Sequence, residues 1–203
     1  MRDPILQVAG HATVLARDDI DTDALFPAEF LKVTVKQGMA QYLFADWLAA
    51  GHPEAAFVRA PAATRVLVVP RNFGCGSSRE HAVWALADYG IQAILALSFG
   101  DIFRNNCVKN GVVAAVVSAP DHRKAVAALR AASAEAASIT LDVASGRATL
   151  PGGETIAFAL APGHAEQLLS GEDDITRTLR YGAELQAYEA RVRAAQPWLE
   201  RID

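Results

Sequence analysis

The stretch Arg65-Val-Leu-Val-Val-Pro-Arg-Asn-Phe-Gly-Cys-Gly-Ser-Ser-Arg-Glu-His81 decides the fold of this chain. Residues 65–70 form a short, continuous apolar run, which is typical of a strand that is buried on both faces of a sheet. Residues 74–78 predict a tight turn, because glycine alternates there with small residues. The sequence from 79 to 89 then predicts a helix, with a glycine directly after it. The stretch is therefore a strand, a turn and a helix.

The segments that follow repeat this order. Residues 91–97 and 112–117 are two further apolar runs of strand length, and a short helix is predicted between them at 101–110. A strand–helix–strand–helix–strand order with these lengths indicates parallel strands with right-handed crossovers.

The rest of the chain adds elements on both sides of this unit. We predict a strand over 7–16, a loop over 17–27, a helix over 39–48, an irregular stretch over 51–64, a helix over 121–137, strands over 139–143, 147–150 and 155–160, and helices over 164–169 and 183–195. The last two strands are joined by Pro151-Gly-Gly-Glu154, which is a hairpin signal. Together these patterns predict one α/β domain over residues 1–203, with a mixed sheet, a parallel core and a β-rich flank.

Composition excludes several classes of protein. The chain has 203 residues, 52% of them hydrophobic, and a net charge of −4, which excludes a disordered chain. No apolar run reaches the roughly 18–20 residues of a membrane-spanning helix, and the first residues lack the features of a signal peptide. We therefore expect a cytoplasmic protein that binds neither membranes nor nucleic acid. Two cysteines are too few for a disulfide framework, an iron–sulfur cluster or a four-ligand zinc site.

The turn is the candidate binding site. Gly74 and Gly76 permit a backbone with positive φ and bring N–H groups close to a ligand. The start of the following helix adds unpaired donors and a partial positive charge. Arg79 supplies a planar guanidinium that suits a carboxylate. These features predict a site for a small carboxylate anion.

The same residues also have structural interpretations. Ser77 and Glu80 fit the capping box S-x-x-E, and the local pattern favours this role over catalysis. His81 lies within reach of Ser77, yet a helix histidine is more often structural, and Cys75 is more often a small turn residue than a nucleophile. Residues 21–23 are either a solvated turn or one wall of the site.

Five segments carry a resemblance to a known family. Residues 74–82, 19–27 and 98–111 resemble the sequence motifs of the small, swivelling domain of the aconitase superfamily. Residues 42–47 and 164–198 are similar to the small subunit of bacterial 3-isopropylmalate dehydratases. The resemblance covers nearly the whole chain.

This resemblance implies a swivelling β/β/α domain that works with a separate large subunit. It implies a four-iron four-sulfur cluster in the large subunit, with no cofactor in this chain. The implied reaction is isomerisation of 2-isopropylmalate to 3-isopropylmalate by removal and re-addition of water, in leucine biosynthesis, with the cluster iron binding the departing hydroxyl. It also implies a mobile substrate loop around 28–38 and a C-terminal helical region over 162–203.

The resemblance assigns roles residue by residue. Ser77 becomes the catalytic base and Arg79 the contact to a substrate carboxylate, with Ser78 beside them. The substrate-binding set is completed by Asp21, Thr22 and Lys32, and no residue is assigned to a metal. The large subunit is expected to contact the 74–79 turn, the 28–38 loop and the C-terminal helix with Trp198.

Three alternatives remain open. Leu31 and Val33 suit an isopropyl group but also a methyl group, so a citraconate or dimethylmalate hydro-lyase is one alternative. A non-catalytic anion-binding module that has lost its partner is the second. A serine hydrolase is a distant third, because the sequence lacks the G-x-S-x-G motif.

Overall fold

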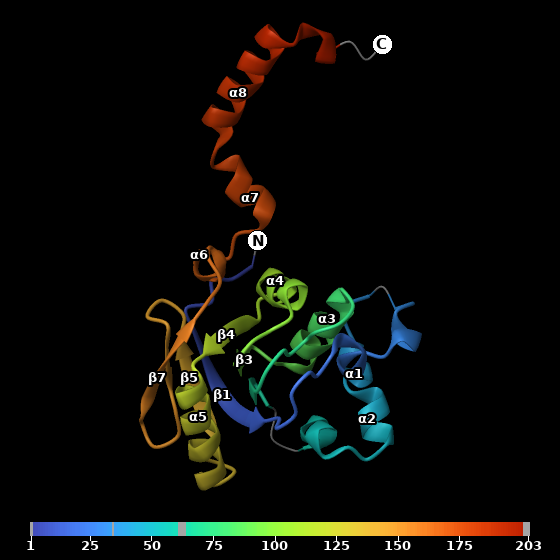
Figure 1. Cartoon of the computed structure of the whole chain (residues 1–203), viewed down its shortest axis with the longest axis vertical. Helices are drawn as coiled ribbons and strands as arrows, with labels where there is room; N and C mark the ends of the chain where they lie inside the picture. The colour runs from blue at the N-terminus through green and yellow to red at the C-terminus, as the bar shows by residue number, and fades with distance from the viewer. Residues whose placement is uncertain (1, 34, 61–63, 201–203) are drawn as a thin grey trace.

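The computed structural model describes residues 2–33, 35–60 and 64–200 (Figure 1). Its elements are β1 (Gln7–Val14), α1 (Thr22–Leu25), α2 (Ala45–Ala49), β2 (Val66–Val69), α3 (Glu80–Tyr89), β3 (Ala93–Ala96), α4 (Asp101–Lys109), β4 (Val113–Val117), α5 (Ala119–Ala131), β5 (Ser138–Asp142), β6 (Arg147–Thr149), β7 (Thr155–Ala159), α6 (His164–Ser170), α7 (Asp174–Leu179) and α8 (Gly182–Ala195). Short 3₁₀ helices cover Ala28–Phe30, Met39–Tyr42, Pro53–Arg59 and Pro197–Glu200.

The described strands form one mixed sheet that closes on itself in the order β1-β2-β3-β4-β7-β6-β5. The pairs β1–β2, β2–β3 and β3–β4 are parallel, and the remaining pairs are antiparallel. The predicted mixed sheet with a parallel core is therefore confirmed. Its closure was not predicted, because it depends on β1 pairing with β2 on one edge and with β5 on the other.

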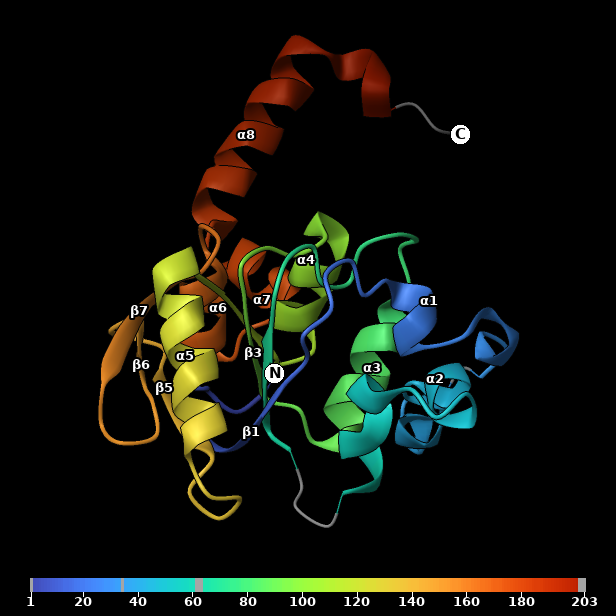
Figure 2. The same cartoon turned by 60° about the horizontal axis from the view of Figure 1, so that its bottom comes forward.

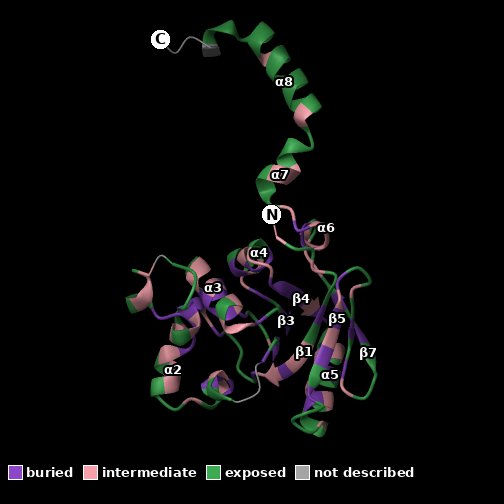
Figure 3. Ribbon diagram, turned by 180° about the vertical axis from the view of Figure 1, so that it is seen from behind, coloured by how far each residue is buried: buried purple, intermediate pink, exposed green. Residues whose placement is uncertain are grey.

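The parallel strands are buried on both faces and separate two apolar clusters. In β2, Val66 and Val68 belong to the cluster that includes β5, β6, β7 and α5. Leu67 and Val69 belong to the other cluster, which includes α1, α3, α4 and much of the segment between α1 and β2. Successive side chains of a strand point to opposite faces, so a continuous apolar run is what two cores require. Figure 3 shows this burial along the central strands.

The predicted helix over 39–48 is wrong in its continuity. A 3₁₀ turn over Met39–Tyr42 is followed by the separate helix α2, and Phe44 between them has a left-handed backbone with φ of +54°. Phe44 is fully buried. Its apolar side chain fits the helical periodicity of the sequence, but its backbone conformation interrupts a helix.

Two helices that were not predicted and one earlier helix end also differ from the prediction. The predicted loop over 17–27 contains the single-turn helix α1, capped by the Asp21 carboxylate on the Ala24 N–H at 2.7 Å. The helix predicted over 121–137 ends at Ala131. Helix α7 was not predicted, and the Asp173 carboxylate caps it on the Thr176 N–H at 2.8 Å.

Helices α7 and α8 project from the body of the molecule as an arm (Figure 1), and Figure 2 shows α8 extending from the body in a second view. Neither helix contains a buried residue. Large apolar side chains are exposed along the arm, namely Ile175, Leu179, Tyr181, Leu185 and Tyr188. Residues 201–203 of the predicted C-terminal helical region lie outside the described residues. Within the described ranges, no helix has the length and apolar character needed to cross a membrane.

Candidate functional site

The turn over residues 72–79 is held against the segment that precedes α1. The Gly74 N–H donates to the Ile20 carbonyl at 2.7 Å, and the Thr22 N–H donates to the Cys75 carbonyl at 3.0 Å. Asp21 and Cys75 form an isolated parallel bridge. Two stretches more than fifty residues apart in the sequence therefore lie side by side, as the prediction that residues 21–23 form a wall of the site requires.

Two glycines allow the turn to lie close to α4. Gly74 has φ of +71°, and a Cβ there would lie 2.1 Å from the Cγ of Phe103. A Cβ on Gly100 would lie 2.5 Å from the Gly74 carbonyl oxygen. Only residues without a side chain permit this approach. The turn is therefore packed directly on the first residues of α4.

A pocket of about 380 Å³ opens at this junction. It is lined by Thr22, Asn72, Gly74, Cys75, Gly76, Ser77, Arg79, Gly100, Asp101, Ile102 and Phe103. The pocket lies beyond the carboxyl ends of β2 and β3, where α/β proteins bind ligands. The first turn of α4 borders it, and its unpaired N–H groups favour an anion.

The two serines are exposed at this pocket or next to it. Ser77 lines the pocket, and its hydroxyl makes no hydrogen bond to any described residue. The Ser77 carbonyl accepts a hydrogen bond from the Thr22 Oγ1 at 2.8 Å, and Thr22 is only 2% exposed. Ser78 is exposed directly after it. Thr22 thus fixes the backbone of Ser77 and leaves its hydroxyl available.

The capping-box interpretation of Ser77 is wrong. Helix α3 begins at Glu80, and Arg79 occupies the N-cap position without a side-chain cap. The Glu80 carboxylate accepts hydrogen bonds from the Trp84 indole at 3.1 Å and from the Asn110 amide at 2.8 Å. Ser77 lies two residues before the N-cap position and is therefore too far from the helix to cap it.

Arg79 is oriented before any ligand binds. Its Nη1 forms an ion pair with Asp23 and lies 3.4 Å from the Phe26 carbonyl oxygen. The side chain is 17% exposed. These contacts use one of the three guanidinium nitrogens, so Nε and Nη2 remain for a second carboxylate.

The other candidate residues lie elsewhere or are structural. Lys32 is exposed and, within the described part of the chain, is not among the residues that line the pocket. The His81 Nε2 lies 3.1 Å from the Val33 carbonyl, and its ring packs against Phe26 and Trp84. The structural interpretation of His81 is therefore confirmed.

Cys75 lines the pocket as an unreactive thiol. Burial raises the pKa of its thiol, and the carboxylates of Asp21 and Asp19 raise it further. The thiolate is therefore disfavoured near neutral pH. Among residues 2–33, 35–60 and 64–200, no group of three or more His, Cys, Asp or Glu side chains is placed to hold a metal ion.

Sequence reasoning missed several residues of the pocket. Asn72 has φ of +55°, and its amide donates to the Asp19 carboxylate at 2.8 Å. The start of α4, from Gly100 to Phe103, forms the opposite wall. A signal was present in the sequence, because the motif over 98–111 contains that wall and includes the carboxylate of Asp101, to which no role was assigned.

Two family models match parts of this chain. A model of the aconitase C-terminal domain matches residues 2–120, and a model of the C-terminal domain of 3-isopropylmalate dehydratase small subunits matches residues 174–202. The 3-isopropylmalate dehydratase small subunit of Rhodospirillum centenum is 43% identical over 198 residues, covering 94% of this chain and 96% of that protein. The corresponding protein of Neisseria meningitidis is 37% identical, covering 91% and 92%.

A solved structure has a similar fold. The crystal structure of 3-isopropylmalate dehydratase from Methanocaldococcus jannaschii superposes with a TM-score of 0.65 at 26% identity. The match covers 90% of this chain and 99% of that one.

Proposed function

Because the chain belongs to the family of 3-isopropylmalate dehydratase small subunits, within the aconitase C-terminal domain family, we propose that it is the small subunit of a hydro-lyase that isomerises 2-isopropylmalate to 3-isopropylmalate. The reaction would belong to leucine biosynthesis, and the protein would act in the cytoplasm. The observation that supports this most is that Ser77 and Arg79 line one anion pocket, with Ser78 beside it.

Arg79 binds a carboxylate of the substrate. Its guanidinium is held by Asp23 through Nη1, and the other two nitrogens present N–H groups in the parallel arrangement that a carboxylate accepts. The N-terminus of α4 adds positive potential on the opposite side of the pocket, where the Asp101 carboxylate of the same turn is paired with Arg104 at 3.2 Å. Thr22 and Asp21 act indirectly, because one fixes the Ser77 backbone and the other caps α1.

Ser77 takes the proton in the elimination step. The Ser77 oxygen removes a proton from the carbon next to a carboxylate, the electron pair forms a carbon–carbon double bond, and the hydroxyl on the neighbouring carbon leaves with its bonding pair as hydroxide. The proton now on Ser77 and this hydroxide together are the elements of the water that is re-added. Re-addition of water with the opposite orientation gives the isomer and returns the proton. A serine oxygen is basic enough only as the alkoxide, which nearby N–H dipoles and the Arg79 guanidinium stabilise.

The iron–sulfur cluster of the family does not fit in this chain. A four-iron four-sulfur cluster is bound by more than two cysteine thiolates, and the sequence has two cysteines. Cys107 is fully buried in the apolar core, and burial raises the pKa of its thiol strongly. We therefore assign the cluster to the large subunit.

The segment after α1 is assigned as the binding site of the substrate's isopropyl group. Leu31 and Val33 are partly buried against the apolar cluster that contains Phe26. Lys32 between them is exposed, and its role in substrate binding stays a prediction. The mobility of the 28–38 loop also stays a prediction, and Thr34 lies outside the described residues.

We assign the arm formed by α7 and α8 as a contact surface for the large subunit. Its exposed apolar side chains have no cover within the described residues. A chain that ends at Glu172 keeps the buried Gly171, whose carbonyl accepts from the Arg2 N–H, and should keep the thermal stability of the body. It should lose affinity for the large subunit, as measured by size-exclusion chromatography of the mixture. Unchanged assembly would contradict this assignment.

The activity is tested by absorbance of the unsaturated diacid formed from 2-isopropylmalate, under anaerobic conditions. Three samples are compared: this chain alone, an iron–sulfur large subunit alone, and the two together. We expect activity only in the mixture. Turnover of citraconate without turnover of 2-isopropylmalate would mean that the substrate assignment is wrong. Absence of turnover with every diacid, in the presence of an intact cluster, would favour a non-catalytic module.

The base is tested by substitution in the same mixture. Loss of a general base lowers the rate by about 10²–10⁴-fold, so Ser77→Ala should do so while the subunits still assemble. Ser133→Ala, an exposed serine after α5, is the matched control and should retain full activity. Activity of Ser77→Ala within about tenfold of the unsubstituted chain would refute the assignment.

A further inference from the structure

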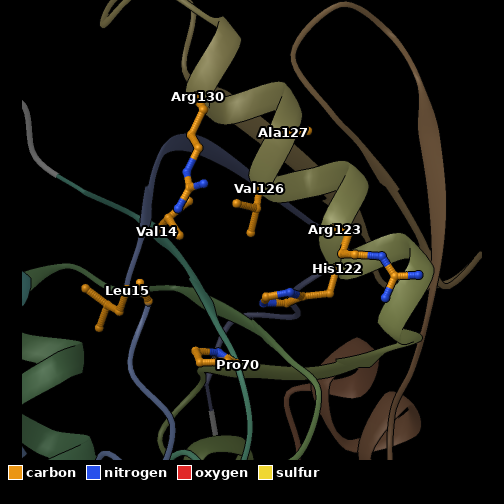
Figure 4. A pocket seen from close by; sticks show the side chains of 9 residues that line it. Val14, Leu15, Pro70, His122, Arg123, Val126, Ala127 and Arg130 are labelled. Atoms are coloured by element: carbon orange, nitrogen blue, oxygen red, sulfur yellow. The ribbon is translucent and has the colours of Figure 1, made fainter.

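A second pocket, of about 350 Å³, lies between α5 and the ends of two parallel strands (Figure 4). It is lined by Val14, Leu15, Ala16, Pro70, His122, Arg123, Val126, Ala127 and Arg130. It shares no lining residue with the pocket of the 72–79 turn. Its volume is at the lower end of the range of small-molecule sites, so a ligand of few atoms fits it.

The buried end of this pocket contains a polar atom without a partner. The His122 Nε2 is buried and makes no hydrogen bond to the described residues. A buried polar group without a hydrogen bond costs about 1–3 kcal/mol, so a polar ligand atom there would be favoured. Burial lowers the pKa of His122, an effect that the Val69 carbonyl and Asp18 oppose and that Arg123 increases. The ring is therefore neutral near neutral pH and offers a hydrogen bond rather than a charge.

The other end of the pocket carries a cation. Arg130 lies eight residues after His122 on α5, so their Cα atoms are about 12 Å apart along the helix axis. Figure 4 shows both side chains directed toward the strand segment, with Val126 between them, whereas Arg123 turns to the other side. Arg130 is exposed and forms no ion pair with any described residue.

Between these two polar ends the wall is apolar. Val14, Leu15 and Pro70 supply it from the strand side, and Val126 supplies it from the helix. An apolar wall with a few polar groups at fixed positions is the usual composition of a small-molecule site. The described lining contains no carboxylate and no aromatic ring other than His122, so it suits an aliphatic anion.

We propose that this pocket binds a short aliphatic carboxylate that carries a hydroxyl group at its far end. The carboxylate pairs with Arg130, the chain lies on Val126 and Leu15, and the far hydroxyl donates a hydrogen bond to the His122 Nε2, because the one N–H of the neutral ring is directed at the Val69 carbonyl. This site is separate from the proposed catalytic pocket, and the proposal does not depend on the proposed function.

Three probes separate these contacts. Binding of 6-hydroxyhexanoate, hexanoate and 1,6-hexanediol to the full chain is measured by titration in two-dimensional NMR. We expect 6-hydroxyhexanoate to bind most tightly, with shifts on α5 and at the end of β1. Each of the other two probes lacks one polar contact and should bind about tenfold more weakly, which corresponds to 1.4 kcal/mol.

Variants assign each contact to its residue. Arg130→Gln should weaken 6-hydroxyhexanoate about tenfold and leave 1,6-hexanediol unchanged, whereas His122→Phe should weaken 6-hydroxyhexanoate and leave hexanoate unchanged. Lys124→Gln is the matched control, because it removes a charge from the same helix without lining the pocket. Thermal unfolding checks that each variant is folded. Absence of saturable binding, shifts at residues 72–79 instead of α5, or equal affinity in Arg130→Gln would overturn the proposal.

Discussion

Substitution of Gly74 by alanine tests whether the turn is packed on α4 as the structure describes. The added Cβ would lie 2.1 Å from the Phe103 Cγ and 2.5 Å from both Cδ atoms, in a backbone with φ of +71°. The ring cannot move away easily, because Phe103 is 3% exposed and packs against Phe73 and Phe99. Both the backbone conformation and the packing therefore oppose the substitution.

The magnitude follows from these two effects. A left-handed backbone costs a residue with a side chain about 1–2 kcal/mol, and overpacking a core costs about 1–3 kcal/mol. Gly76→Ala is the matched control, because φ there is +86° but the nearest heavy atom to its Cβ, on Asp21, lies at 3.5 Å. Gly76→Ala should therefore show the backbone cost alone.

The assay is thermal and urea unfolding of the two variants. Overpacking of about 2 kcal/mol should lower the Tm of Gly74→Ala by about 4–8 °C below that of Gly76→Ala. Since displacement of the turn also moves Ser77 and Arg79, the activity of the Gly74→Ala mixture should fall as well. Equal Tm values for the two variants would refute the close packing of the turn on Phe103.

Two further predictions concern groups beside the site. Burial raises the pKa of Glu80, but hydrogen bonds from Asn110 and Trp84 outweigh this and hold it below the usual 4.5. The ionised Glu80 carboxylate therefore stabilises the fold fully above its ordinary pKa of 4.5, and this stabilisation is lost as the pH falls through the lowered pKa of the folded state. The difference in unfolding free energy between the unsubstituted chain and Glu80→Gln should accordingly shrink in acid and stay constant above about pH 6. Thr22→Val removes the hydroxyl that donates to the Ser77 carbonyl, so it should lower the free energy of unfolding in urea by about 1–3 kcal/mol and also lower kcat. An unchanged kcat would show that this hydrogen bond does not position Ser77.

The sequence was sufficient for the parallel core, and the reason is the burial pattern. Residues 66–69, 93–96 and 113–117 are short apolar runs between helices, and a strand buried on both faces is the structure that such runs favour. The hairpin between β6 and β7 was also predictable, because glycines mark its turn.

Closure of the sheet and the start of α3 were not predictable in the same way. The β1–β5 pair joins residues such as Val8 and Leu141, and nothing local to either strand specifies that partner. The Ser77 capping box failed because the position of the turn depends on Phe103 and Gly100, which lie more than twenty residues further along the chain. Local patterns predict elements, whereas contacts distant in sequence decide where an element begins.

On the proposed function, the arrangement of the site gives this chain a second reason, besides the cluster, to need the large subunit. Arg79 is already oriented by Asp23, and the Ser77 backbone is already fixed by Thr22, so the positions of both groups are set in the chain alone. The Ser77 side chain nevertheless stays exposed to water, where an alkoxide is poorly stabilised against its hydroxyl. Exclusion of water strengthens every charge interaction in a site, so covering this pocket with the large subunit raises the influence of Arg79 and the α4 N-terminus on Ser77. On the proposed function, assembly therefore activates the base as well as bringing the second half of the site.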